Sequence, residues 1–312
     1  MNLKAAYIVP HPPLAVPAVG RGQEHAIAAT LESCREVARR IAAHAPAVLV
    51  FVSPHTAYYA DWIYVAAGAR AAGDFGQFGA PGTRFSLTFN AELRAALCAA
   101  AEEAGIPAGM TSRSAQELDH GIMVPLYFIE EARERAARDG RGERDQREEQ
   151  DGRGEQTEQI EPAAPWRYQA VSVGGSALPR KLLLEFGRCV ARAIEAQDKS
   201  VVLVVSGDLS HRLLASGPYG FDPAGPRFDE QFATIIEAGN LSVLADIDPQ
   251  LAEDAGECGL SGFIMLAGAL EEAQRRYGCR HSSELLSCEG PFGVGYGVAA
   301  FELEEGSPHE KR

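Results

Sequence analysis

The sequence predicts an α/β fold built around a mostly parallel central sheet with helices on both of its faces. Three continuous apolar runs carry this prediction, because such runs are typical of parallel strands that are buried on both faces. The runs are residues 5–9, 48–52 and 200–205. Segments with helical spacing of apolar residues alternate with them, which favours a parallel sheet. The length of 312 residues is compatible with one large domain or two modest ones.

The elements follow one another in a regular order. The first strand, residues 5–9, stops at Pro10-His11-Pro12-Pro13, since proline cannot continue a central strand ladder. A helix is expected from about residue 24 to residue 44, and the strand at 48–52 then completes a strand, helix, strand unit. Further helices are expected at 91–104, 124–138, 180–196 and 261–276, and a closing strand at 295–303.

One stretch of the chain does not fit this pattern. Between about residues 136 and 165 the composition changes to Arg, Asp, Glu, Gln and Gly with almost no apolar residue. Such a segment cannot bury enough surface to offset its ordering entropy, so we expect a solvated, disordered insertion. A functional acidic arm is the alternative interpretation. Residues 306–312 are expected to form a polar tail.

Charge and composition exclude several classes of partner. The formal net charge of -14 opposes attraction to phosphate backbones and to anionic lipid, so we expect no nucleic-acid partner. No apolar run approaches the roughly 18 to 20 residues of a membrane-spanning helix, and a cytoplasmic protein is expected. The six cysteines form no C-x-x-C pair, which argues against a zinc ribbon or a disulfide scaffold.

Histidines follow the three apolar runs. His11, His55 and His211 each come shortly after one of these strands, and ligands of open α/β sheets bind outside the carboxyl ends of the strands. A fourth histidine, His120, stands at a predicted helix start. Each of them alone has an alternative interpretation, which is an imidazole satisfied by neighbouring backbone. Four together indicate a site at which the imidazoles converge.

Two imidazoles and a carboxylate form the arrangement that holds ferrous iron in oxygen-using enzymes. Glu257, in a glycine-flanked turn before an apolar helix, is the best carboxylate candidate for a site with His11 and His55. Its alternative role is a favourable charge at a helix N-terminus. Asp208 and Asp119 are interpreted as supporting residues that cap a helix or orient a ligand imidazole.

Several short motifs together resemble the catalytic LigB-type subunit of class III extradiol ring-cleavage dioxygenases. More narrowly, the chain resembles the branch associated with AmmeMemoRadiSam gene systems, to which the Memo proteins are also similar. The resemblance covers nearly the whole chain outside the insertion. The motifs are Val9-Pro10-His11-Pro12-Pro13, Ser53-Pro54-His55, Asp74-Phe75-Gly76-Gln77-Phe78-Gly79, Leu118-Asp119-His120-Gly121, Ser206-Gly207-Asp208-Leu209-Ser210-His211 and Glu257-Cys258-Gly259.

The resemblance implies a single α/β domain, here residues 1–305, and an Fe(II) ion held by His11, His55 and Glu257. It further implies His211 and His120 as acid/base residues. In such an enzyme a catechol-type diol or an aminophenol reacts with dioxygen. His211 would remove a phenolic proton and His120 would donate one during ring opening. A homo-oligomer or a partner subunit is compatible with this assignment.

Two alternatives stay open at this point. The Memo proteins use a cysteine at the corresponding step, which is Cys258 here, and this would give a metal-binding protein of a modification or signalling pathway without ring cleavage. A zinc-dependent hydrolase would use the same histidines with a metal-bound water as nucleophile, so Zn(II) is the alternative to iron. Six aromatic residues either line an apolar pocket or belong to the core: Tyr58, Tyr59, Phe75, Phe78, Tyr127 and Phe292.

Overall fold

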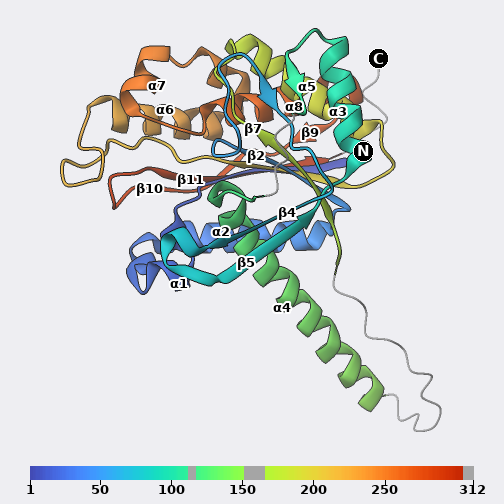
Figure 1. Ribbon diagram of the computed structural model, residues 1–312. Helices are drawn as coiled ribbons and strands as arrows, with labels where there is room; N and C mark the ends of the chain where they lie inside the picture. Colours follow the sequence, from blue (N-terminus) through green and yellow to red (C-terminus); the bar gives the residue numbers. More distant parts are fainter. Residues whose placement is uncertain (112–116, 151–165, 305–312) are drawn as a thin grey trace.

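A computed structural model describes residues 1–111, 117–150 and 166–304, with residues 139–150 described by their backbone alone. In this part of the chain, seven strands form one sheet that runs through the middle of the molecule (Figure 1). The strand order is β10 (Glu284–Glu289), β11 (Tyr296–Glu304), β1 (Leu3–Val9), β8 (Val201–Ser206), β2 (Val48–Ser53) and β7 (Gln169–Gly174), and β9 (Arg280–His281) also pairs with β11.

The sheet is mixed but mostly parallel along its centre. Strands β1, β8, β2 and β7 pair in parallel, whereas β11 runs antiparallel to β1, β9 and β10. All residues of β2 and β8 are buried, which is why these strands read as continuous apolar runs. In β1 the side chains alternate, so that Tyr7 enters one core and Ile8 enters the other.

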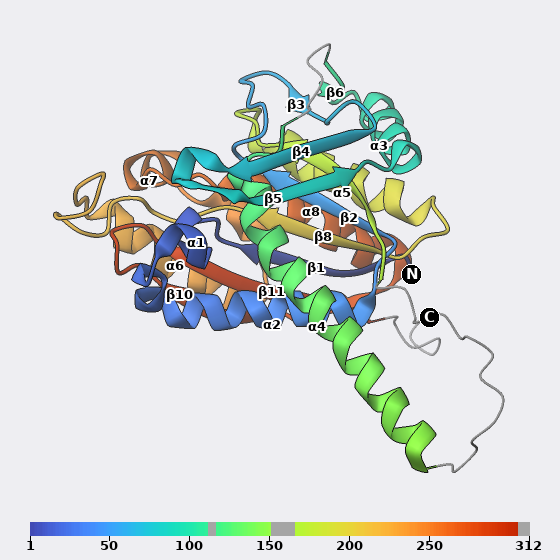
Figure 2. The same cartoon turned by 60° about the horizontal axis from the view of Figure 1, so that its bottom comes forward.

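Helices cover both faces of the sheet, and the predicted α/β class is confirmed. One face packs against α3, α5, α6, α7 and α8, while the other packs against α2, α4 and a two-stranded hairpin of β4 and β5 (Figures 1 and 2). The helices are α1 (Pro17–Gly20), α2 (Ala28–His44), α3 (Ala91–Glu103), α4 (His120–Gln150), α5 (Arg180–Glu195), α6 (Ala224–Ala238), α7 (Pro249–Ala255) and α8 (Leu260–Tyr277). The remaining elements are β3 (Ile63–Tyr64), β4 (Arg70–Phe75), β5 (Ala80–Thr88), β6 (Ala108–Gly109), and the short 3-10 helices η1 (Pro13–Ala15), η2 (Gln23–Ile27), η3 (Gly76–Phe78) and η4 (Leu241–Asp246).

The start of α4 differs from the prediction. Sequence reasoning began this helix at Val124, whereas it begins at His120. The earlier start is stabilised by Asp119, whose carboxylate accepts a hydrogen bond from the Ile122 amide at 3.2 Å. As a result His120 stands in the first helical turn, at the carboxyl edge of the sheet.

The predicted insertion lies partly within α4. Residues 136–150 continue this helix beyond the body of the molecule (Figure 2). Residues 151–165 and the predicted polar tail lie outside the described residues, so disorder there stays a prediction. Among the described helices, none combines the length and the apolar composition that crossing a membrane requires.

Replacing residues 139–161 by a short Gly/Ser linker should leave the fold intact, because this stretch offers almost no apolar side chains for packing. We expect a melting temperature within a few degrees of the wild-type value in circular dichroism. Ile129→Ala is the matched control on the same helix, since Ile129 is fully buried and its truncation should cost about 2–5 kcal/mol. A linker variant that melts like the control would show that the segment packs on the domain.

Candidate metal centre

Three of the histidines predicted at strand ends reach one edge of the sheet. His11 follows β1, His55 follows β2 and His211 follows β8, and β8 lies between β1 and β2 in the sheet. The three strands are parallel, so their carboxyl ends meet at the same edge. The first residue of α4, His120, comes to this edge from a separate element.

Three imidazoles form a tight group. Ring nitrogens of His11, His55 and His120 all lie within 4.8 Å of one another. The closest pair is His55 Nε2 and His11 Nε2, at 2.9 Å. Ring nitrogens that face one another at this distance either share a proton or direct their lone pairs toward one cation. His211 is not part of this group.

Residues on β8 and its following loop fix the ring of His11. Its Nδ1 lies 2.9 Å from the hydroxyl oxygen of Ser206, and its backbone amide donates to Asp208 Oδ1 at 2.9 Å. A proton on Nδ1, donated to Ser206, leaves the lone pair of Nε2 directed at His55. Asp208, expected to cap a helix or to orient a ligand imidazole, holds the backbone of His11, while Ser206 was missed. The missed signal was its position as the last residue of a buried strand.

Asp119 ties the turn that carries His55 to the start of α4. Its two carboxylate oxygens accept hydrogen bonds from Ser53 Oγ at 2.7 Å and from Thr56 Oγ1 at 2.6 Å. Ser53 and Thr56 bracket His55 in the chain. A side chain at Gly121 would place its Cβ 2.3 Å from Ser53 Oγ, so the close approach of helix and turn requires glycine. Asp119 therefore positions His55 and His120 together.

Burial keeps the imidazoles of His11 and His120 neutral. Desolvation, and then the proximity of His55, lower the pKa of His11 to about 3. The pKa of His120 falls to about 3 for the same reasons, burial first and then its two histidine neighbours. Neutral imidazoles are the form that binds metal, so His11 and His120 are ready to coordinate a cation at neutral pH. Burial also raises the pKa of Asp208 to about 6.

The two residues of the Glu257-Cys258 step point in different directions. The carboxylate of Glu257 accepts a hydrogen bond from the Leu260 amide at 2.6 Å and so caps α8. The Cys258 sulfur lies 3.7 Å from His11 Nε2 and accepts a hydrogen bond from the Asp208 amide at 3.3 Å. Burial raises the pKa of the thiol, and it raises the pKa of Glu257 to about 7. The thiol is thus beside the histidine group, and the carboxylate is turned to a helix.

His211 stands in a loop that two distant elements hold in place. Its backbone amide donates to the Ala255 carbonyl at 3.0 Å, and the amide of the preceding Ser210 donates to Asp229 Oδ1 at 2.9 Å. The Nδ1 atom of His211 is buried and has no hydrogen-bond partner in the described part of the chain. Sequence reasoning missed Asp229, because a single acidic residue on a helix carries no local signal of burial. Desolvation raises the pKa of this carboxyl group to about 7.

The aromatic candidates divide between the site and the core. Phe78 packs edge-on against His120, with ring centroids 5.4 Å apart. Tyr58, three residues after His55, is 53% exposed. The other four lie in or against the hydrophobic core: Tyr59, Phe75, Tyr127 and Phe292.

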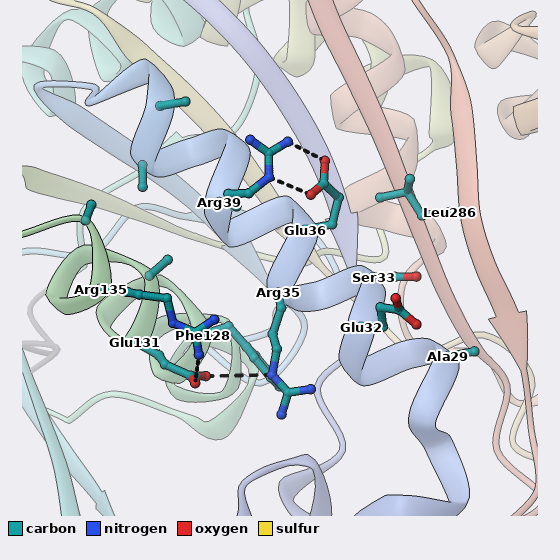
Figure 3. Close-up of a pocket in the computed structure, with 14 residues that line it drawn as sticks. Ala29, Glu32, Ser33, Arg35, Glu36, Arg39, Phe128, Glu131, Arg135 and Leu286 are labelled. Atoms are coloured by element: carbon teal, nitrogen blue, oxygen red, sulfur yellow. Dashed lines mark hydrogen bonds and ion pairs between the residues drawn. The ribbon is translucent and has the colours of Figure 1, made fainter. Parts of the chain in front are cut away.

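A separate groove of about 780 Å³ lies between α2 and α4 (Figure 3). Most of its charged side chains are paired with one another, since Glu131 contacts both Arg35 and Arg135 while Glu36 contacts Arg39. The groove is lined by neither histidine nor cysteine. The groove therefore offers no imidazole or thiol ligand for a metal, unlike the histidine group.

Comparisons with known proteins give the family and the fold of the chain. The family described as the catalytic LigB subunit of aromatic ring-opening dioxygenase matches residues 5–140 and 162–299. A Clostridium acetobutylicum protein, Protein CA_C1420, is 35% identical over 309 residues, which cover 97% of this chain and 58% of that relative. The chain thus spans less than two thirds of the length of this relative. An uncharacterized Escherichia coli K12 protein of known crystal structure, JW3007, shares the fold with a TM-score of 0.56 at 14% identity, covering 96% of this chain and 99% of that one.

Asp229→Asn should stabilise the protein more at high pH than at low pH. The folded protein keeps a proton on Asp229 that the unfolded chain releases between about pH 4 and 7, so the free energy of unfolding falls as pH rises through this window. Asparagine does not titrate, and its side-chain oxygen can still accept from the Ser210 amide. Urea unfolding at about pH 5 and pH 8 should show a difference from wild type that grows with pH, by about 1.4 kcal/mol per unit of pKa shift at most. The exposed Asp61→Asn is the control for losing one carboxylate, and a difference independent of pH would contradict the prediction.

Proposed function

The chain belongs to the LigB family of aromatic ring-opening dioxygenases, and we propose that it is an Fe(II)-dependent extradiol dioxygenase acting on a small catechol-type or aminophenol-type ring. The observation that carries the proposal is the convergence of His11, His55 and His120 at the carboxyl edge of the sheet. The neutral imidazoles of His11 and His120, close to the exposed His55, suit a divalent metal ion.

The proposed ligands are His11 and His55, with Glu257 as the third. To coordinate the metal, the Glu257 carboxylate has to leave the N–H group of Leu260. The metal ion carries a larger positive charge than this N–H group and would therefore attract the carboxylate more strongly. A ferrous ion held by these residues would supply the chemistry that joins dioxygen to the diol.

The remaining residues handle protons. We assign His211 as the base that takes a phenolic proton, since its buried Nδ1 has no hydrogen-bond partner among the described residues and is free to accept one. His120 is neutral and directs its ring toward His11 and His55, from where it can donate a hydrogen bond to the oxygen side of the reaction. Asp119 and Asp208 hold the turns that carry these groups.

A second candidate function is favoured by the position of Cys258. Its sulfur is 3.7 Å from His11 Nε2, a separation typical of two ligands that share one metal. A thiolate would make a softer site, similar to that of the Memo proteins, and would suit zinc or iron without ring cleavage. Burial favours the protonated form of the free thiol. A bound metal would favour the thiolate and so counteract this effect of burial.

His11→Ala and His55→Ala should each abolish stoichiometric metal binding without unfolding the protein, because both side chains lie in loops beyond the strand ends. The measurement is metal content after anaerobic Fe(II) loading, with circular dichroism to verify the fold. His25→Ala, an exposed histidine in η2, is the matched control and should retain full metal. A variant at His11 or His55 that keeps metal at wild-type affinity would remove that residue from the ligand set.

Glu257→Ala and Cys258→Ser should have opposite effects. In the ring-cleavage proposal Glu257→Ala loses both metal and ring-opening activity, whereas Cys258→Ser keeps both. Activity is followed as oxygen uptake and as the absorbance of ring-opened products in a screen of catechols and aminophenols. The reverse pattern, in which Cys258→Ser releases the metal and Glu257→Ala retains it, would support the second candidate and remove the dioxygenase assignment.

A further inference from the structure

The loop that follows His211 projects beyond the carboxyl end of the sheet. It joins β8 to α6 and extends past the other elements on that side (Figure 2). Its base is closed by a hydrogen bond from the Asp222 amide to the Arg212 carbonyl at 3.1 Å and by an antiparallel bridge between Leu213 and Phe221. We refer to residues 212–222 as the His211 loop.

The glycine-rich turn before β11 fixes this loop. The Leu213 amide donates to the Gly293 carbonyl at 3.0 Å. A Cβ at Gly293, whose φ is +87°, would lie 2.9 Å from the Cα of Gly217, so the two backbones meet where side chains have no room. The His211 loop is therefore held in one position against the turn before β11.

Two aromatic rings of the loop are exposed. Tyr219 is 62% exposed and Phe221 is 54% exposed. The two differ in their neighbours, because the ring of Tyr219 packs edge-on against His211 with centroids 5.1 Å apart and an interplanar angle of 86°. Among the described residues, Phe221 contacts no other ring. Tyr219 is therefore exposed and also in contact with the proposed catalytic base, whereas Phe221 is exposed without such a contact.

We propose that Tyr219 is a specificity-determining residue that forms the outer wall of the substrate site and packs on the aromatic ring of the bound diol. This inference rests on the function proposed above, in which His211 takes a phenolic proton. A ring whose hydroxyl group reaches His211 also lies beside Tyr219, since the two side chains are in contact. Aromatic pairs prefer offset or edge-to-face contacts with centroids about 4.5–7 Å apart, and the exposed side of Tyr219 is open for such a contact.

Binding of 4-nitrocatechol to the protein loaded anaerobically with Fe(II) tests this role without turnover. Tyr219→Ala should weaken binding by about three- to tenfold, because one aromatic contact is lost. Tyr219→Phe keeps the ring and should bind as the wild type does. Phe221→Ala is the matched control on the same loop and should also leave the affinity unchanged.

A second ligand separates a ring contact from damage to the metal site. Acetohydroxamate chelates metal but has no ring, so Tyr219→Ala should bind it as tightly as the wild type does. Equal losses for both ligands, or an unchanged affinity of Tyr219→Ala for 4-nitrocatechol, would overturn the proposal. So would a wild-type protein that does not bind 4-nitrocatechol. A wild-type protein that binds it but takes up no oxygen with any diol would refute ring cleavage alone and leave the Tyr219 comparison valid.

Discussion

The parallel pairing of β1, β8 and β2 is the constraint on which the rest of the site depends. In this register Val9 lies opposite Ser206, and Val52 lies opposite Val205, so the three strands end within a residue of one another. A loop residue that follows β1 is then a neighbour of residues that follow β8 and β2. The contacts of His11 with Ser206, Asp208 and His55 result from this alignment, although the residues are up to 197 positions apart in the chain.

Burial of polar groups at this edge has an energetic cost, and hydrogen bonds offset it. Asp208 accepts a hydrogen bond from the His11 amide. Asp119 accepts hydrogen bonds from two hydroxyl groups and one backbone amide. Two of the three imidazoles, His11 and His120, are kept neutral by desolvation, and His11 Nε2 faces His55 Nε2 at 2.9 Å. The hydrogen bonds around His11, His55 and His120 thus position these rings before a metal binds.

Much of the fold and part of the site could be predicted from the sequence. Buried parallel strands leave continuous apolar runs, and a histidine that follows such a run is visible without a structure. His120 was included among the converging histidines from its place near a helix start, and Asp119 begins that helix four residues earlier than periodicity suggests. Ser206, Asp229 and Tyr219 act through contacts between distant elements, which no local pattern records. The choice between Glu257 and Cys258 is similarly a matter of which way one turn directs two adjacent side chains.

The most direct test of the central claim is an anaerobic crystal structure of the Fe(II)-loaded protein with anomalous scattering at the iron edge. The account predicts one iron peak bound by the Nε2 atoms of His11 and His55 at about 2.1 Å, with at least two positions left for other ligands. An iron peak elsewhere on the molecule, or a fully loaded protein with neither histidine bound to the iron, would contradict it.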